Sequence, residues 1–188
     1  MPIANAKNRG YFKIKGACTA FNFDFRDRTV LDIGSSTGGF TEYALEQGAK
    51  KVIAVEKGSN QMKSPLRFDK RIDLHEKTDI FDFEIIADII VADVSFLSLT
   101  KILAYAKNNL SNDKTDFLVM LKPQFEARPD QLNKGVVKNE AIRRGIIKSF
   151  EQWLKNNNFI IIKKRDNDLF GKNGNKERFY WLRIAQKN

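Results

Sequence analysis

The chain has 188 residues, of which 42% are hydrophobic and 30% are charged, and these proportions are typical of one globular domain that covers residues 1–188. No apolar run is long enough to span a membrane, residues 1–10 lack the apolar core of a secretory signal, and the single cysteine excludes an internal disulfide, so we expect a cytoplasmic protein. The net charge of +10 suits a protein that approaches phosphate backbones, and it equally suits a general lysine bias.

Short β-branched runs alternate with helical patterns along the first 157 residues. Strands are predicted at residues 29–33, 51–55, 72–76, 89–93 and 117–121, and helices at residues 40–47, 97–110 and 140–157. Apart from residues 72–76, these strand runs are apolar without alternation, which is typical of strands that are buried on both faces. Strands that alternate with helices predict an α/β fold with a parallel sheet and right-handed crossovers.

The C-terminal part departs from this alternation. Residues 159–165 and 178–184 both have strand character, and the polar, Gly- and Asn-rich residues 166–177 between them are unsuited to a helix. We therefore expect a mostly parallel sheet of seven strands that ends in an antiparallel hairpin. By analogy at the level of folds, this ending is typical of Rossmann-like class I methyltransferases and distinguishes them from dinucleotide-binding domains.

A glycine-rich turn joins the first strand to the first predicted helix. Glycines in such a turn adopt positive φ and let the backbone approach a ligand closely, and ligands of open α/β sheets lie at the carboxyl ends of the strands. Asp32 lies at the strand end, where a carboxylate suits a cationic amino-acid group and repels a pyrophosphate. The predicted cofactor-binding residues of this segment are Asp32, Gly34, Ser36, Thr37, Gly38, Gly39 and Phe40.

Further acidic residues follow the next strands. Glu56 ends the second strand, about 20 residues beyond the glycine turn, where a carboxylate can accept hydrogen bonds from ribose hydroxyls. Asp79 follows the third strand as a candidate acceptor for an adenine amino group, and Asp93 ends the fourth strand beside the cofactor. Together with the glycine turn, these positions predict S-adenosylmethionine as the cofactor. An NAD(P) cofactor is the competing interpretation, and the missing G-x-G-x-x-G pattern counts against it.

Two oppositely charged residues end neighbouring predicted strands. Asp93 ends the fourth strand, and Lys122 follows the fifth, directly before Pro123, which restricts the backbone after the lysine. A lysine held beside an acid at this edge can handle the proton of an unactivated hydroxyl. The competing interpretation is a purely structural ion pair, which fits a cofactor-binding edge less well.

Five segments of the chain together resemble a known family. The resemblance is to the TlyA haemolysin family, which belongs to the FtsJ-like ribosomal RNA 2′-O-methyltransferases, and it extends from about residue 9 to residue 183. The combination of motifs is specific, although each of them is short. The segments are residues 29–40, 91–98, 121–126, 134–137 and 175–182.

The resemblance implies an S-adenosylmethionine-dependent enzyme that methylates a ribose 2′-hydroxyl of ribosomal RNA, at cytidine. Lys122 would deprotonate or orient the hydroxyl, two carboxylates would position the lysines, and Lys13 would help to hold the nucleotide. The implied catalytic tetrad is Lys13, Asp93, Lys122 and Glu177. No metal is required, because the sulfonium already activates the methyl group and most of the catalysis is alignment. Ribosomal RNA or ribosomal subunits are the expected partners.

Two other functions compete with this interpretation. One is a membrane-active haemolysin, although no amphipathic or spanning segment supports it. The other is a non-catalytic RNA-binding module that has kept the fold. The small RNA-binding domain that usually begins such proteins is absent from these 188 residues, which makes substrate affinity the property most in question, and the oligomeric state stays open.

Basic clusters flank the proposed catalytic segments and favour an RNA contact at the active edge. Ribose chemistry in folded RNA requires local unstacking of bases. Tyr11, Phe125 and Phe170 are candidates to stack on an extruded base. The alternative for these aromatic residues is a place in the hydrophobic core, and for Phe125 this alternative is the stronger one.

Overall fold

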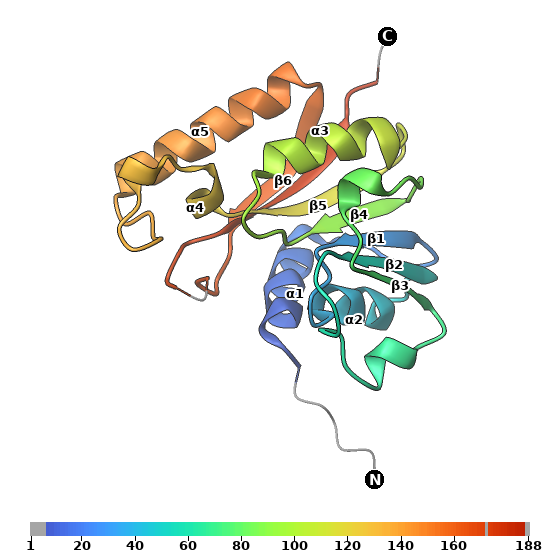
Figure 1. Ribbon diagram of the computed structural model, residues 1–188. Coiled ribbons are helices and arrows are strands. Elements are labelled where there is room, and N and C mark those ends of the chain that lie inside the picture. Colours follow the sequence, from blue (N-terminus) through green and yellow to red (C-terminus); the bar gives the residue numbers. More distant parts are fainter. Residues whose placement is uncertain (1–6, 172, 187–188) are drawn as a thin grey trace.

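The computed structural model describes residues 7–171 and 173–186. Its centre is a seven-stranded sheet in the order β3-β2-β1-β4-β5-β7-β6 (Figure 1). The first five strands run parallel, and β7 lies antiparallel between β5 and β6. The predicted α/β sheet, mostly parallel and with a terminal antiparallel hairpin, is confirmed. The strands are β1 Thr29–Ile33, β2 Lys51–Glu56, β3 Ile72–Glu76, β4 Ile89–Ala92, β5 Asp116–Leu121, β6 Phe159–Asp166 and β7 Arg178–Ile184.

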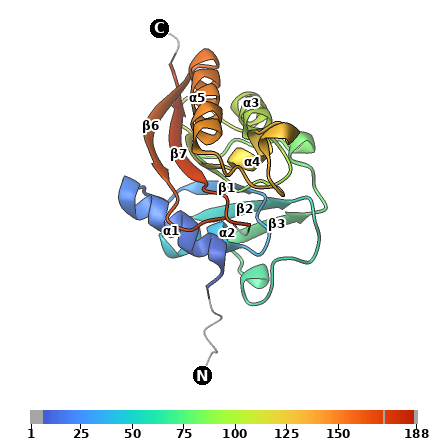
Figure 2. The same cartoon turned by 90° about the vertical axis from the view of Figure 1, so that its left-hand side faces the viewer.

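Helices cover both faces of the sheet. Helices α1 (Arg9–Phe21) and α2 (Gly39–Glu46) pack on one face, and α3 (Leu99–Asn109) and α5 (Glu140–Asn156) pack on the other (Figure 1, Figure 2). The remaining short elements are η1 Leu66–Phe68, η2 Ile80–Asp82, α4 Pro123–Glu126 and η3 Pro129–Gln131. The three helices predicted from the sequence are all present, with each end within two residues of its predicted position. Among the described residues, no helix has the length and apolarity that a membrane span needs.

Helix α1 has no counterpart among the predicted elements. Asn8 caps it, because the Asn8 side chain accepts a hydrogen bond from Tyr11 N at 3.1 Å. A buried stripe with i, i+3, i+4, i+7 spacing runs from Ile14 to Phe21 and packs on the sheet. Glycines at positions 10 and 16 lower the helix propensity of the segment. Tertiary packing therefore decides this helix, which is why local sequence patterns did not predict it.

The alternation of side chains along the strands determines which charged residues meet. In β5, Met120 faces α1 and α2, whereas Leu121 faces α3 and α5. Successive side chains point to opposite faces, so Lys122 returns to the α1 side. Side chains alternate in the same way where β1, β4 and β7 reach the sheet edge formed by the carboxyl ends of the parallel strands, since Val30, Val91 and Phe179 all face α1 and α2. This alternation places four charged side chains on the α1 side of that edge: Asp32, Asp93, Lys122 and Glu177.

Candidate active site

Two ion pairs lie at the carboxyl edge of the sheet, on the side that α1 covers. Lys122 follows β5 and has its Nζ 2.6 Å from Asp93 Oδ1, and it also donates a hydrogen bond to Ser95 Oγ at 3.0 Å. Lys13 of α1 has its Nζ 2.6 Å from Oε2 of Glu177, the residue before β7. The structure thus arranges the residues of the implied tetrad as two oppositely charged pairs. Ser95 is a contact that the sequence did not indicate.

A cavity of about 220 Å³ adjoins both pairs. Lys13, Asp93 and Lys122 line it, whereas Glu177 is not part of its lining. Most of the predicted cofactor turn lines the same cavity: Asp32, Gly34, Ser36, Thr37, Gly39 and Phe40. Gly38 lies next to this lining as the residue that caps α2. Across the described residues, no group of three or more His, Cys, Asp or Glu side chains is placed to hold a metal ion.

The two ion pairs differ in their exposure. The side chains of Lys13 and Glu177 are 8% and 3% exposed, whereas those of Lys122 and Asp93 are 11% and 22% exposed. A charge in the protein interior is costly unless it is paired, so Glu177 is the partner that allows Lys13 to remain inside. The Lys122–Asp93 pair is the more accessible one, and a substrate that enters the cavity reaches it more readily.

Glycine at position 39 lets α1 reach the site. Gly39 begins α2, and a Cβ there would collide with the Asn8 side chain and lie 2.6 Å from Tyr11 N. Glycine therefore permits the first turn of α1 to pack directly on α2, and this contact sets the position of Lys13 in the next turn. Gly34 has a different requirement, because its φ of +80° lies in the left-handed region. The glycine turn thus positions α1, which carries Lys13, as well as the loop that lines the cavity.

Asp32 is fully buried at the end of β1. Thr41 of α2 donates a hydrogen bond to Asp32 Oδ2 at 2.6 Å, while Asp32 Oδ1 is buried without a hydrogen-bond partner among the described residues. Burial raises the pKa of this carboxyl to about 7; the Thr41 bond opposes the rise, and the negative charge of Asp93 adds to it. A buried oxygen with no partner, on a residue that lines a cavity, is a ready acceptor for a cationic ligand group.

The remaining predicted cofactor residues lie outside the cavity lining. Glu56 ends β2, and its carboxylate accepts hydrogen bonds from Ser36 N at 2.9 Å and Gly58 N at 2.6 Å. Asp79 precedes η2 and pairs with Lys57 at 2.9 Å. Glu56 is therefore joined to the glycine turn through Ser36, whereas Asp79 lies beyond it and is engaged with a surface lysine.

A further contact holds together the chain segments that follow β4 and β5. Glu126 ends α4 and accepts hydrogen bonds from Ser98 Oγ and Leu99 N, both at 2.7 Å. Ser98 caps α3 and ends the segment that leaves Asp93, whereas α4 follows Lys122. The Glu126 carboxylate therefore ties the exit of β5 to the exit of β4, at a helix N-terminus that favours negative charge. Glu126 is not among the predicted site residues, and its place about one helical turn after Lys122 is the signal that could have indicated it.

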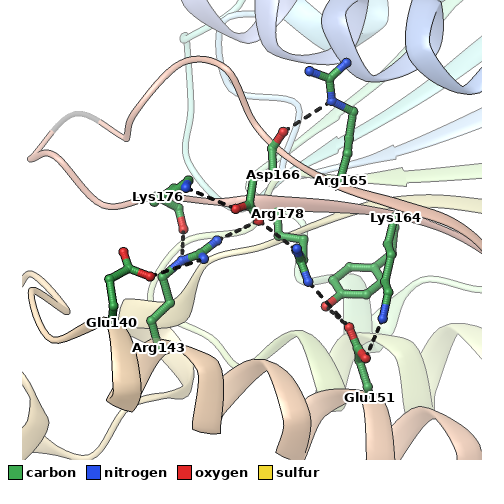
Figure 3. A network of polar contacts seen from close by, with 9 residues as sticks. Glu140, Arg143, Glu151, Lys164, Arg165, Asp166, Lys176 and Arg178 are labelled. Atoms are coloured by element: carbon green, nitrogen blue, oxygen red, sulfur yellow. Dashed lines mark hydrogen bonds and ion pairs between the residues drawn. The ribbon is translucent and has the colours of Figure 1, made fainter.

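The chain around Glu177 is fixed from the opposite face of the sheet. Arg143 of α5 is buried and donates hydrogen bonds to the Lys176 carbonyl at 3.1 Å and to Asp166 Oδ1 at 2.7 Å (Figure 3). Asp166 Oδ1 also accepts a bond from Arg178 at 2.7 Å. Burial opposes ionisation of Asp166, but the bonds from Arg143 and Arg178 lower its pKa to about 2. Since Lys176 and Arg178 flank Glu177, the network holds the backbone on both sides of it.

Aromatic side chains lie close to Lys122. Phe96 is 91% exposed and packs against Phe125, with 5.3 Å between the ring centroids. Lys122 Nζ lies 5.8 Å from the centroid of the Phe125 ring. Phe170 is also exposed, whereas Tyr11 lies on the buried face of α1 and is part of the hydrophobic core. The expectation that Tyr11 could stack on a base is therefore wrong, and Phe96 is an exposed ring beside the site that the sequence analysis missed.

Loss of the Glu177 charge should destabilise the protein through Lys13. Lys13 is almost buried, and a Glu177→Leu variant leaves its charge without this counter-ion. We therefore expect the free energy of unfolding to fall by about 3–5 kcal/mol. A Lys13→Met/Glu177→Leu double variant removes both charges and should recover most of that loss. Urea unfolding of the two variants and the parent measures the difference. A double variant as unstable as the single one would contradict the assignment of Glu177 as the counter-ion.

The fold and the site together define the class of protein. The strand order with an antiparallel β7, the glycine turn after β1 and the charged carboxyl edge are those of an α/β methyltransferase. The family model of FtsJ-like methyltransferases matches residues 6–184. The chain belongs to the FtsJ-like methyltransferase family.

Individual relatives agree with this assignment. A 23S rRNA (cytidine-2′-O)-methyltransferase TlyA of Campylobacter jejuni is 34% identical over 93% of this chain and 69% of its own length. A 16S/23S rRNA (cytidine-2′-O)-methyltransferase TlyA of Mycobacterium tuberculosis is 35% identical over 94% of this chain and 68% of its own length. A solved structure of a candidate haemolysin from Streptococcus thermophilus is 31% identical with a TM-score of 0.90, and the match covers 96% of this chain and 67% of that one. The expected relationship to the TlyA haemolysin family is confirmed.

Proposed function

We propose that this protein transfers a methyl group from S-adenosylmethionine to the ribose 2′-hydroxyl of a cytidine in ribosomal RNA. The observation that carries the proposal is the convergence of two lysine–carboxylate pairs on one cavity beside the glycine turn. The names of the Campylobacter jejuni and Mycobacterium tuberculosis relatives support the RNA class and the ribose position. Ribosomal subunits are the partners in this proposal, and the cytoplasm is then the place of action.

The residues of the cavity fit S-adenosylmethionine. Asp32 contributes a buried carboxylate oxygen that has no hydrogen-bond partner in the described part of the chain, which suits the amino group of the methionine part. Gly34 and Ser36 belong to the same lining. Glu56, which accepts a hydrogen bond from Ser36 N, would accept further hydrogen bonds from the ribose hydroxyls. Asp79 receives the adenine amino group beyond this lining. When bound, the cofactor supplies a methyl group activated by a positively charged sulfur.

Lys122 handles the proton of the ribose hydroxyl. Nζ would accept that proton, and the bound cofactor would supply the methyl group to the hydroxyl oxygen. Asp93 lies 2.6 Å from Nζ and stabilises the ammonium that results. Ser95 Oγ, which accepts a hydrogen bond from the same nitrogen, restricts its direction. Lys122 thus acts as the base, and Asp93 orients it.

Lys13 and Glu177 set the charge on the other side of the cavity. Lys13 lines the cavity with a positively charged group that can hold the target nucleotide, while Glu177 fixes its direction from a buried position. The backbone around Glu177 is held in turn by the Arg143–Asp166 contact. Alignment by these fixed charges is a large part of the proposed catalysis.

Methyl transfer to defined RNA tests the proposal. The purified protein is incubated with radiolabelled S-adenosylmethionine and unmodified ribosomal subunits, and the labelled nucleoside is identified by mass spectrometry. We expect label on the ribose of a cytidine. Label on a base ring atom, or RNA binding without any transfer, would contradict the proposal. Leakage of liposomes that depends neither on cofactor nor on Lys122 would favour the haemolysin alternative.

A further inference from the structure

A charged groove of about 430 Å³ lies between α5 and the hairpin of β6 and β7, on the face of the sheet opposite α1. It is lined by ten side chains, of which nine carry a charge. Three are acidic: Glu140, Glu151 and Asp166. Six are cationic: Arg143, Arg144, Lys148, Lys164, Lys176 and Arg178. Six cations against three acids leave the groove with a formal charge of +3.

Each acidic residue of the groove pairs with a cation that lines it, Glu140 with Arg143 at 3.9 Å. Asp166 Oδ1 pairs with Arg143 and Arg178, and its Oδ2 lies 3.2 Å from Lys176 Nζ (Figure 3). Glu151 pairs with Lys164 at 2.7 Å and with Arg178 at 3.7 Å. Asp166 and Glu151 therefore neutralise cations of the groove walls and are not available to pair with other cations.

Arg144 and Lys148 supply the excess positive charge. Both are exposed on α5, and within residues 7–171 and 173–186 neither has an ionic partner. They are four residues apart, so their Cβ atoms lie about 5–6 Å from each other on one helix face. Two free cations at that spacing beside a positive groove suit successive phosphates of one nucleic-acid strand.

The groove meets the catalytic edge at β7. Lys176 and Arg178 line the groove, while Glu177 between them points to the other face and pairs with Lys13. Lys176 and Arg178 are the chain neighbours of Glu177, and one extended residue spans at most about 3.6 Å. The groove therefore begins directly behind the Lys13–Glu177 pair. An RNA strand with one nucleotide in the active site can continue around this edge into the groove.

We propose that this groove binds the phosphate backbone of the RNA strand next to the target nucleotide, with Arg144 and Lys148 as its free phosphate contacts. The inference rests on the proposed function and adds a second contact surface for the same substrate. RNA fits better than a membrane, because Ile147 is the only apolar residue among the described residues that line the groove, whereas a helix that binds a lipid surface needs an apolar face.

The salt dependence of RNA binding tests the groove. An Arg144→Gln/Lys148→Gln variant of the full chain is compared with the parent by fluorescence anisotropy, using a fluorescein-labelled 20-nucleotide single-stranded RNA between 50 and 200 mM NaCl. Loss of two phosphate contacts should reduce the slope of log K against log salt by about 1.4, since each contact to a single strand contributes about 0.7. The KM for ribosomal subunits should rise by about 10-fold, and S-adenosylmethionine affinity should stay unchanged.

A matched control separates the groove from net charge. Lys50 and Lys70 are exposed, precede β2 and β3 at the opposite edge of the sheet, and have no ionic partner in the described part of the chain. A Lys50→Gln/Lys70→Gln variant loses the same charge and should keep the parental slope. Equal slopes in the groove and control variants would overturn the proposal. It would also be overturned if the groove variant lost binding to anionic phosphatidylserine vesicles and kept RNA binding.

The groove and the proposed function can fail separately. A parent protein that transfers no methyl group but whose RNA slope depends on Arg144 and Lys148 refutes the function and supports the groove. A parent that methylates ribosomal RNA, with a groove variant indistinguishable from the control, refutes the groove alone.

Discussion

Replacement of Lys122 by methionine should lower kcat for methyl transfer by about 10²- to 10⁴-fold, the usual contribution of a positioned base. Methionine keeps an apolar stem of similar length but cannot take the hydroxyl proton, and it removes the group 2.6 Å from Asp93. The affinity for S-adenosylmethionine should change little, because Lys122 contacts Asp93 and Ser95 and not the glycine turn. Single-turnover transfer to ribosomal subunits measures the effect, alongside calorimetric titration of the cofactor.

Two control variants test whether the loss of kcat is specific to the lysine amine at position 122. Lys101 of α3 is exposed, and a Lys101→Met variant should keep the parental kcat. A Lys122→Arg variant retains the positive charge but cannot act as a base near neutral pH, so it should be nearly as slow as Lys122→Met. An arginine variant with parental kcat would show that position 122 acts through its charge, and a methionine variant within a few-fold of the parent would remove Lys122 from the chemistry altogether.

Replacement of Asp32 by asparagine should weaken S-adenosylmethionine binding in a pH-dependent way. Burial holds the pKa of Asp32 near 7, so its carboxyl is ionised in the free protein above that pH and neutral below it. At pH 8.5 the variant loses a charge-assisted contact to the cofactor amino group, and its Kd should be about 10- to 150-fold higher than that of the parent. At pH 5.5 the parent carboxyl is also neutral, so the ratio should fall to a few-fold. Calorimetric titration at both pH values measures it.

The same substitution should act on stability with the opposite sign. The pKa of Asp32 is raised from 3.8 in the unfolded chain to about 7 in the folded protein, so the folded state retains its proton longer as pH rises. Between pH 4 and pH 7 this group therefore lowers the free energy of unfolding, and above pH 7 its contribution is constant. Asp32→Asn removes this loss, so the variant should gain stability relative to the parent as pH rises across that window. A variant that lost cofactor affinity equally at pH 5.5 and pH 8.5 would contradict the proposed contact.

Local patterns were sufficient to predict the strands and most of the helices. Apart from β3 and the charged end of β6, the strands are mainly apolar runs, and the polar residues 166–177 exclude a helix before β7. The meeting of Asp93 with Lys122 could also be anticipated, because they follow β4 and β5, and parallel strands carry their carboxyl ends to one edge. Helix α1 could not, since its glycines weaken the helical signal and its packing on α2 compensates for them.

The contacts that make the site work depend on packing that no local pattern records. Lys13 and Glu177 lie at opposite ends of the sequence, and they meet because α1 docks on the face to which Glu177 points. Resemblance to a family named both residues, but only the folded chain shows them as a buried pair. The burial of Asp32 likewise follows from the helices above β1. The strands, the glycine turn and the neighbouring Asp93 and Lys122 are therefore encoded locally. The cavity and the groove behind Glu177 instead arise from how helices dock on a sheet whose side chains alternate between its two faces.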